Sequence, residues 1–141
     1  MQKLIKTLFK DNIIYIAISI TLFIGVLSLM KLQGGSIKFI HIDKVEHAFA
    51  YCVLTLSWLL AIKGTGEKTR LKYTVALSCV FFGMIIEVLQ AILTTYRTAS
   101  LLDILANSVG IGIALLLFKF VYKKINAIKN EASLRNETFI Q

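Results

Sequence analysis

The sequence predicts an all-α integral membrane bundle of four transmembrane helices. Its 141 residues are 57% hydrophobic and 17% charged, whereas soluble domains average about 45–50% apolar and about 25% charged residues. The chain also contains four apolar runs, each close to the ~20 residues that a bilayer crossing requires. One soluble core of this size could not hide so much apolar surface, and the mean hydropathy of +0.74 agrees. Backbone polar groups in lipid must bond internally, so the runs are expected to be helices.

The four runs are separated by short connections, which suit antiparallel neighbours in a bundle. No proline interrupts them, so none of them needs a proline kink. Lysines precede the first run as they do in a signal peptide, but its apolar core is too long and no small-residue cleavage site follows. We expect a transmembrane domain over 13–122 with helices at about 13–30, 45–62, 73–93 and 101–122, a basic N-terminal segment at 1–12 and a basic tail at 123–141.

The basic residues predict the orientation of the chain. Twelve lysines and arginines fall in the N-terminal segment, the second loop and the tail, against four on the other side. The positive-inside rule then places both termini in the cytoplasm. The formal charge of +8 would suggest nucleic-acid binding in a soluble protein. Here the positions of the charges are explained by membrane orientation and lipid headgroups, so we expect membrane lipids and no nucleic acid as partners.

Polar residues on three of the predicted helices fall at one depth. Counted from the outward helix ends at about 1.5 Å per residue, His47 lies about 6 Å in and Glu87 about 9 Å in. On the same scale Asp103 and Asn107 lie at about 4 and 10 Å, and Arg97 falls in the short outer loop above them. Because the helices run in different directions, this coincidence predicts a polar site in the outer half of the bilayer.

Most of these residues also have a structural interpretation. Asp43 with Glu46, and Ser100 with Asp103, have the spacing of a helix N-cap and its acidic partner. Tyr51 continues the Asp43 and His47 stripe at i, i+4, i+8 and fits an ordinary buried aromatic residue. Asn107 fits an interhelical hydrogen bond.

Glu87 is harder to explain structurally, because a carboxylate among apolar residues costs several kcal/mol unless it is paired or protonated. His47 and Arg97 are its expected partners. Gln90 shares the face of Glu87 at i, i+3.

The order and spacing of these residues resemble the VanZ-like membrane proteins. The resemblance covers about residues 42–117 and rests on Asp43-Lys44-x-x-His47, on Glu87-x-x-Gln90 and on Arg97-Thr98-Ala99-Ser100-Leu101-Leu102-Asp103-x-x-x-Asn107. The family commonly has a Pro-Gly-like turn before the arginine, where this chain has Thr94, Thr95 and Tyr96. The resemblance implies a multi-pass protein of the bacterial cytoplasmic membrane. It also implies a link to low-level resistance against the glycopeptide antibiotic teicoplanin.

The leading functional hypothesis is a binding site for an anionic lipid or cell-envelope precursor headgroup. Arg97 would grip a phosphate or carboxylate in a bidentate manner, and the other polar residues would orient the ligand. The predicted ligand-binding residues are Asp43, His47, Glu87, Gln90, Arg97, Asp103 and Asn107.

Three alternatives remain open. The first is a membrane-embedded hydrolase or transferase acting on a phosphorylated envelope lipid, with His47, Glu87 and Asp103 as its catalytic residues. Together with Asp43 these residues would also suit a divalent metal held by Asp43, His47, Glu87 and Asp103. No metal-ligand spacing such as HExxH occurs, and we expect no metal or cofactor. The second is a structural or homo-oligomeric subunit that associates through the small-residue face of Ala106, Gly110 and Ala114. Transport is the least favoured, because the predicted polar groups occupy only one half of the bundle.

Overall fold

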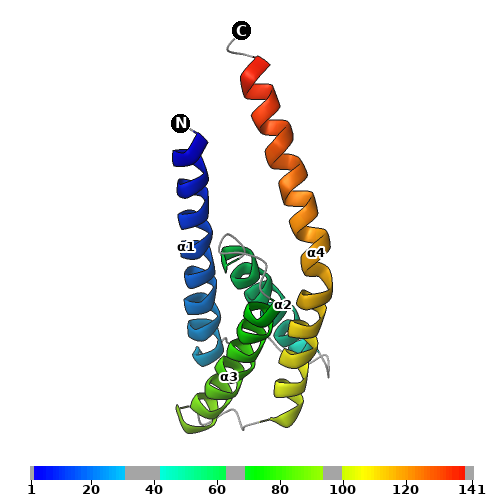
Figure 1. Ribbon diagram of the computed structural model, residues 1–141. Coiled ribbons are helices and arrows are strands. Elements are labelled where there is room, and N and C mark those ends of the chain that lie inside the picture. Colours follow the sequence, from blue (N-terminus) through cyan, green and yellow to red (C-terminus); the bar gives the residue numbers. More distant parts are fainter. Residues whose placement is uncertain (1, 31–41, 63–68, 94–99, 139–141) are drawn as a thin grey trace.

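The computed structural model describes residues 2–30, 42–62, 69–93 and 100–138, and its helices form one bundle (Figure 1). In chain order the helices are α1 (Gln2–Leu29), α2 (Ile42–Ile62), α3 (Thr69–Leu93) and α4 (Leu101–Thr138). All four contain a stretch that is long and apolar enough to cross a membrane. This confirms the predicted all-α class, and helix length and hydropathy make the chain a multi-pass membrane protein.

The predicted helix ends at 62, 93 and 101 agree with the structure, α2 and α3 begin a few residues earlier than predicted, and the largest differences are in α1 and α4. α1 begins at Gln2 rather than near residue 13, and α4 continues to Thr138 rather than stopping near residue 122. The prediction ended each helix where the hydrophobicity ended, but lysine and glutamate are good helix formers, so a helix can continue beyond its apolar stretch. At about 57 Å, α4 is longer than the ~30 Å hydrocarbon core. The outer ends of α1 and α4 lie at the same end of the molecule (Figure 1).

The helices α2 and α4 approach each other closely at Gly110. A Cβ built on Gly110 would lie 2.8 Å from the carbonyl carbon of Ala48 and would overlap its oxygen, so only glycine fits. Ala114 is fully buried one turn further along α4. Within the single chain α2 therefore already covers Gly110, and the predicted contact of Ala106, Gly110 and Ala114 with a second copy stays a prediction.

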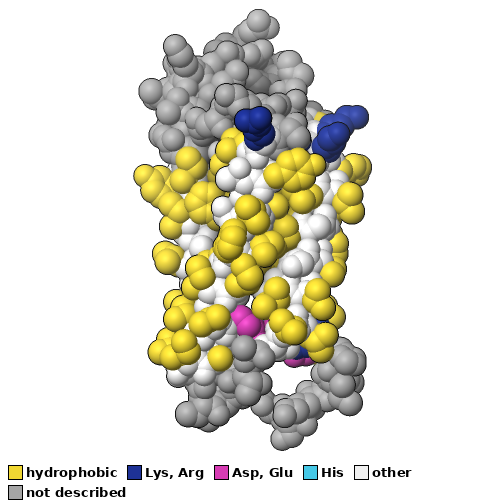
Figure 2. Space-filling model, turned by 60° about the horizontal axis from the view of Figure 1, so that its bottom comes forward, with side chains coloured by type: hydrophobic (Ala, Val, Ile, Leu, Met, Phe, Trp, Pro, Cys, Tyr) yellow, Lys and Arg dark blue, Asp and Glu magenta, His cyan; other side chains and the backbone are white. Residues whose placement is uncertain are grey.

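The buried apolar core runs along the inward faces of all four helices. Glu87, Gln90, Asn107, Thr55 and Ser57 are the buried polar residues of the described chain. Hydrophobic side chains also cover most of the visible described surface, with Lys or Arg near one end and Asp or Glu near the other (Figure 2). A bundle embedded in lipid requires such an apolar surface. The core consists of Ile24, Tyr51, Leu54, Leu59, Val75, Cys79, Ile111 and Phe118.

A hydrogen bond between side chains fastens α1 to α2. The indole Nε1 of Trp58 donates to the hydroxyl oxygen of Thr21 at 3.0 Å, and that hydroxyl donates to the Ala17 carbonyl at 2.8 Å. We expect Trp58→Phe to lower the free energy of unfolding by about 0.5–1.5 kcal/mol, the usual net value of one hydrogen bond. Thermal unfolding of the purified protein in detergent measures this, and an unchanged midpoint would contradict it.

Candidate functional site

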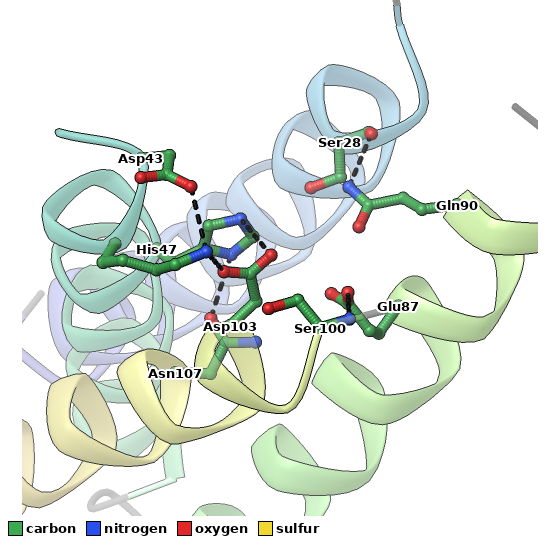
Figure 3. Close-up of polar contacts among 9 residues, drawn as sticks. Ser28, Asp43, His47, Glu87, Gln90, Ser100, Asp103 and Asn107 are labelled. Carbon is green, nitrogen blue, oxygen red and sulfur yellow. Dashed lines mark hydrogen bonds and ion pairs between the residues drawn. The ribbon is translucent and has the colours of Figure 1, made fainter. Parts of the chain in front are cut away.

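Four charged or ionisable side chains of α2 and α4 meet at the end of the bundle opposite the chain termini. Lys44 Nζ donates to Asp43 Oδ2 at 2.9 Å and also to Asp103 Oδ1. His47 lies beside them, with Nε2 4.0 Å from Asp103 Oδ2. We call Asp43, Lys44, His47 and Asp103 the charged cluster. Figure 3 shows it where the first turns of α2 and α4 come together.

Asn107 fixes the orientation of the His47 ring. The ring nitrogen Nδ1 lies 3.1 Å from Asn107 Oδ1, and in the tautomer with hydrogen on Nδ1 the ring donates to that oxygen. The other ring nitrogen is then turned toward Asp103. Asn107 is 3% exposed, so the predicted interhelical hydrogen bond is present and its partner is His47.

Glu87 caps the N-terminus of α4 from the neighbouring helix. Its Oε1 accepts a hydrogen bond from the backbone N–H of Ser100 at 2.5 Å, and the side chain is buried. Within the described residues no ion pair joins Glu87 to His47, the partner expected from the sequence. The physical reason is that free N–H groups at a helix start carry partial positive charge, and the N-terminus of α4 lies beside the end of α3, whereas His47 faces α4 from α2 (Figure 3).

Because Glu87 accepts the Ser100 N–H, the Asp103 carboxylate can take part in the charged cluster. In a capping box the acid at the third helical position would bond the N–H of Ser100, but Glu87 already occupies that N–H. The Asp103 carboxylate instead contacts Lys44 and faces His47. Asp43 is also not an N-cap, because α2 begins at Ile42 and the Asp43 carboxylate pairs with Lys44.

Gln90 lies in a different contact from the charged cluster. Its Nε2 donates to the backbone carbonyl of Ser28 at 2.8 Å, so it joins α3 to the end of α1. Figure 3 shows its side chain directed toward the Ser28 carbonyl. A buried amide that bonds a free carbonyl at a helix C-terminus is explained by helix packing.

Tyr51 lies one turn below His47 on α2, is 2% exposed and has a hydroxyl without a hydrogen-bond partner among the described residues. It packs against Gly83 of α3. A Cβ on Gly83 would lie 3.1 Å from Tyr51 Cε1 and 3.0 Å from Asn107 Nδ2. Gly83 thus allows Tyr51 and Asn107 to converge beneath the charged cluster.

Exposure divides Lys44 and the described residues of the predicted site into two groups. The side chains of Asp43, Lys44, Asp103 and His47 are 50%, 27%, 14% and 13% exposed, so a ligand can reach them. Glu87, Gln90 and Asn107 are at most 3% exposed and hold other parts of the chain.

Arg97, the predicted binding residue in the outer loop, falls outside the described residues, so its role stays a prediction. Lys44 is the central cation of the charged cluster. It was part of a predicted motif but not one of the predicted site residues, although a lysine at the depth of Asp103 was the available signal. The described residues contain no group of three or more His, Cys, Asp or Glu placed to hold a metal ion, which does not support the alternative metal set on Asp43, His47, Glu87 and Asp103.

Comparisons with known proteins give one partial relative. No family model and no solved structure matches the chain. An uncharacterized protein of Schizosaccharomyces pombe is 37% identical over 84 residues, which are 58% of this chain and 49% of that protein. The chain therefore spans about half the length of this relative.

Proposed function

We propose that this protein binds the phosphate-bearing headgroup of a membrane lipid at the charged cluster. The observation that carries the proposal is a partly exposed group of charges at the end of a bundle whose described surface is mostly apolar. Ionisable groups in membrane spans are costly, and such groups mark functional sites by default. Exposed apolar side chains surround the charged cluster and would contact the acyl chains; they are Ile42, Val45, Leu102 and Leu105.

The accessible and buried residues have different parts in this proposal. Lys44 would bind the phosphate, and the imidazolium form of His47 would donate a second, charge-assisted hydrogen bond from Nε2. Arg97 is the further donor expected from the sequence. Asp43 and Asp103 orient Lys44. Glu87, Gln90 and Asn107, which were predicted as direct ligands, would instead hold α4, α1 and the His47 ring in place.

The lipid class and leaflet belong to the proposal as well. With both termini in the cytoplasm, the charged cluster faces the outer leaflet of a bacterial cytoplasmic membrane. The similarity to a fission-yeast protein favours a glycerophospholipid, which bacteria and fungi share, over a peptidoglycan precursor. Membership of the VanZ-like family would connect this site to teicoplanin, because a protein that covers headgroups could hinder a lipid-anchored antibiotic.

The geometry of His47 supports a second candidate, hydrolysis or transfer on the same headgroup. An imidazole oriented by an amide and facing a carboxylate is the usual arrangement of a catalytic acid or base. Glu87 fits that role less well, because its carboxylate is buried and bonded to Ser100.

One experiment tests both candidates. Wild type, Lys44→Gln and His47→Gln are purified in nanodiscs that contain phosphatidylglycerol and phosphatidylethanolamine, and the retained lipids and their products are followed by native mass spectrometry. We expect retained phospholipid to fall about tenfold in Lys44→Gln, which corresponds to about 1.4 kcal/mol. Loss of product in His47→Gln with lipid still bound would favour the enzyme.

Glu46→Gln is the matched control, because it removes a carboxylate from the same turn of α2 at an exposed position. It should retain as much phospholipid as the wild type. Equal retention in Lys44→Gln and the wild type would overturn the proposal, provided that circular dichroism shows both to be folded.

A further inference from the structure

The accessible part of the charged cluster carries both signs of charge. It presents two carboxylates, one ammonium and one imidazole, and the Lys44 ammonium contacts both Asp43 and Asp103. An anion that approaches Lys44 therefore comes close to one or both of these carboxylates.

A headgroup with only negative charge fits this arrangement poorly. Its phosphate could bond the third N–H of the Lys44 ammonium or replace Asp43 or Asp103 there, and in either case at least one carboxylate would remain beside the new negative charge. Asp103 is only 14% exposed, so water cannot fully screen that repulsion. A headgroup with only positive charge also fits poorly. The carboxylates that would attract that headgroup have the positively charged Lys44 ammonium between them.

A headgroup with both charges avoids the two penalties. Its phosphate can take the place of a carboxylate on Lys44, while its ammonium takes the place of Lys44 on that carboxylate. Every charge of the charged cluster then keeps a partner, and the net charge of the site does not change.

Resting on the proposed headgroup function, we propose that the bound lipid carries a primary ammonium beside its phosphate, as phosphatidylethanolamine does. The ammonium faces Asp43 and Asp103, and the phosphate faces Lys44 and His47. A primary ammonium has three N–H donors and can bond both carboxylates. A trimethylated ammonium has the same charge and no N–H donor, so phosphatidylcholine satisfies the carboxylates less well.

The test is a competition between lipids with identical acyl chains. The full chain in detergent is mixed with equimolar phosphatidylethanolamine, phosphatidylcholine, phosphatidylglycerol and diacylglycerol, and bound lipids are counted by native mass spectrometry. The wild type should retain phosphatidylethanolamine at least about tenfold over each of the other three. In Asp103→Asn its preference over phosphatidylglycerol should fall to within about twofold, and Glu46→Gln should keep the wild-type ratio.

The outcomes separate this inference from the function on which it rests. If phosphatidylglycerol or phosphatidylcholine binds the wild type as well as phosphatidylethanolamine, the inference is wrong and headgroup binding stands. If diacylglycerol binds as well as the phospholipids, headgroup binding itself is wrong. Should Asp103→Asn fail to fold, Asp43→Asn replaces it, because that side chain is half exposed and tolerates substitution; an unchanged ratio there would count against the inference.

Discussion

Gly110→Ala is expected to destabilise the bundle by about 1–3 kcal/mol, the usual cost of forcing extra atoms into a packed core. The added methyl group would overlap the Ala48 carbonyl, which is backbone and cannot rotate away as a flexible side chain can. The helices must therefore move apart along the most extensive contact of the fold, between α2 and α4. Thermal unfolding in detergent, followed by circular dichroism, measures the loss.

Gly112→Ala is the matched control for this prediction. Gly112 lies two residues further along α4, and a Cβ there would meet nothing within 4 Å. The substitution should leave the unfolding midpoint unchanged or raise it slightly, because alanine favours the helix over glycine. Equal behaviour of the two variants would show that the helices do not cross at Gly110.

Glu87→Ala is expected to lower the free energy of unfolding by about 1.5–3 kcal/mol, the value of a hydrogen bond that involves a charged group. It leaves the Ser100 N–H without its acceptor at the start of α4. Glu87→Gln keeps a carbonyl oxygen in the same place and should cost only about 1 kcal/mol. Both variants are measured by thermal unfolding beside Glu46→Gln, which should behave as the wild type.

The same variants distinguish a helix cap from a catalytic base. A cap predicts that phospholipid retention in Glu87→Gln follows its folded fraction. A general base predicts full stability and complete loss of turnover. A fully stable and inactive Glu87→Gln would therefore return Glu87 to the catalytic role that the sequence suggested.

The helices could be predicted because hydrophobicity and the absence of proline both act locally along the chain. Four apolar runs gave four helices, and the ends at Ile62, Leu93 and Leu101 agree with the structure. Depth could be predicted for a similar reason, because a fixed rise per residue converts sequence position into height. The meeting of α2 and α4 through Lys44 and Asp103, and through His47 and Asn107, is consistent with that count.

The individual partners could not be predicted, because they depend on how each helix is rotated and which neighbour it faces. Glu87 and Asp103 have similar depths, yet one faces the start of α4 and the other faces α2. Gln90 shares a helix face with Glu87 but reaches α1 instead. No spacing rule within one helix contains this information. It is set by the packing of small residues such as Gly83 and Gly110.

The pairing of Lys44 with two aspartates has a consequence for how the chain enters the membrane. α2 precedes α4 in the chain, with α3 between them, so Lys44 is synthesised before Asp103. Its neighbour Asp43 lies on the same turn and can neutralise it during that interval, which lowers the cost of an unpaired charge near lipid. Once α4 packs against α2, Asp103 becomes a second partner of Lys44, so this ion pair can form only in a chain in which both helices are in place.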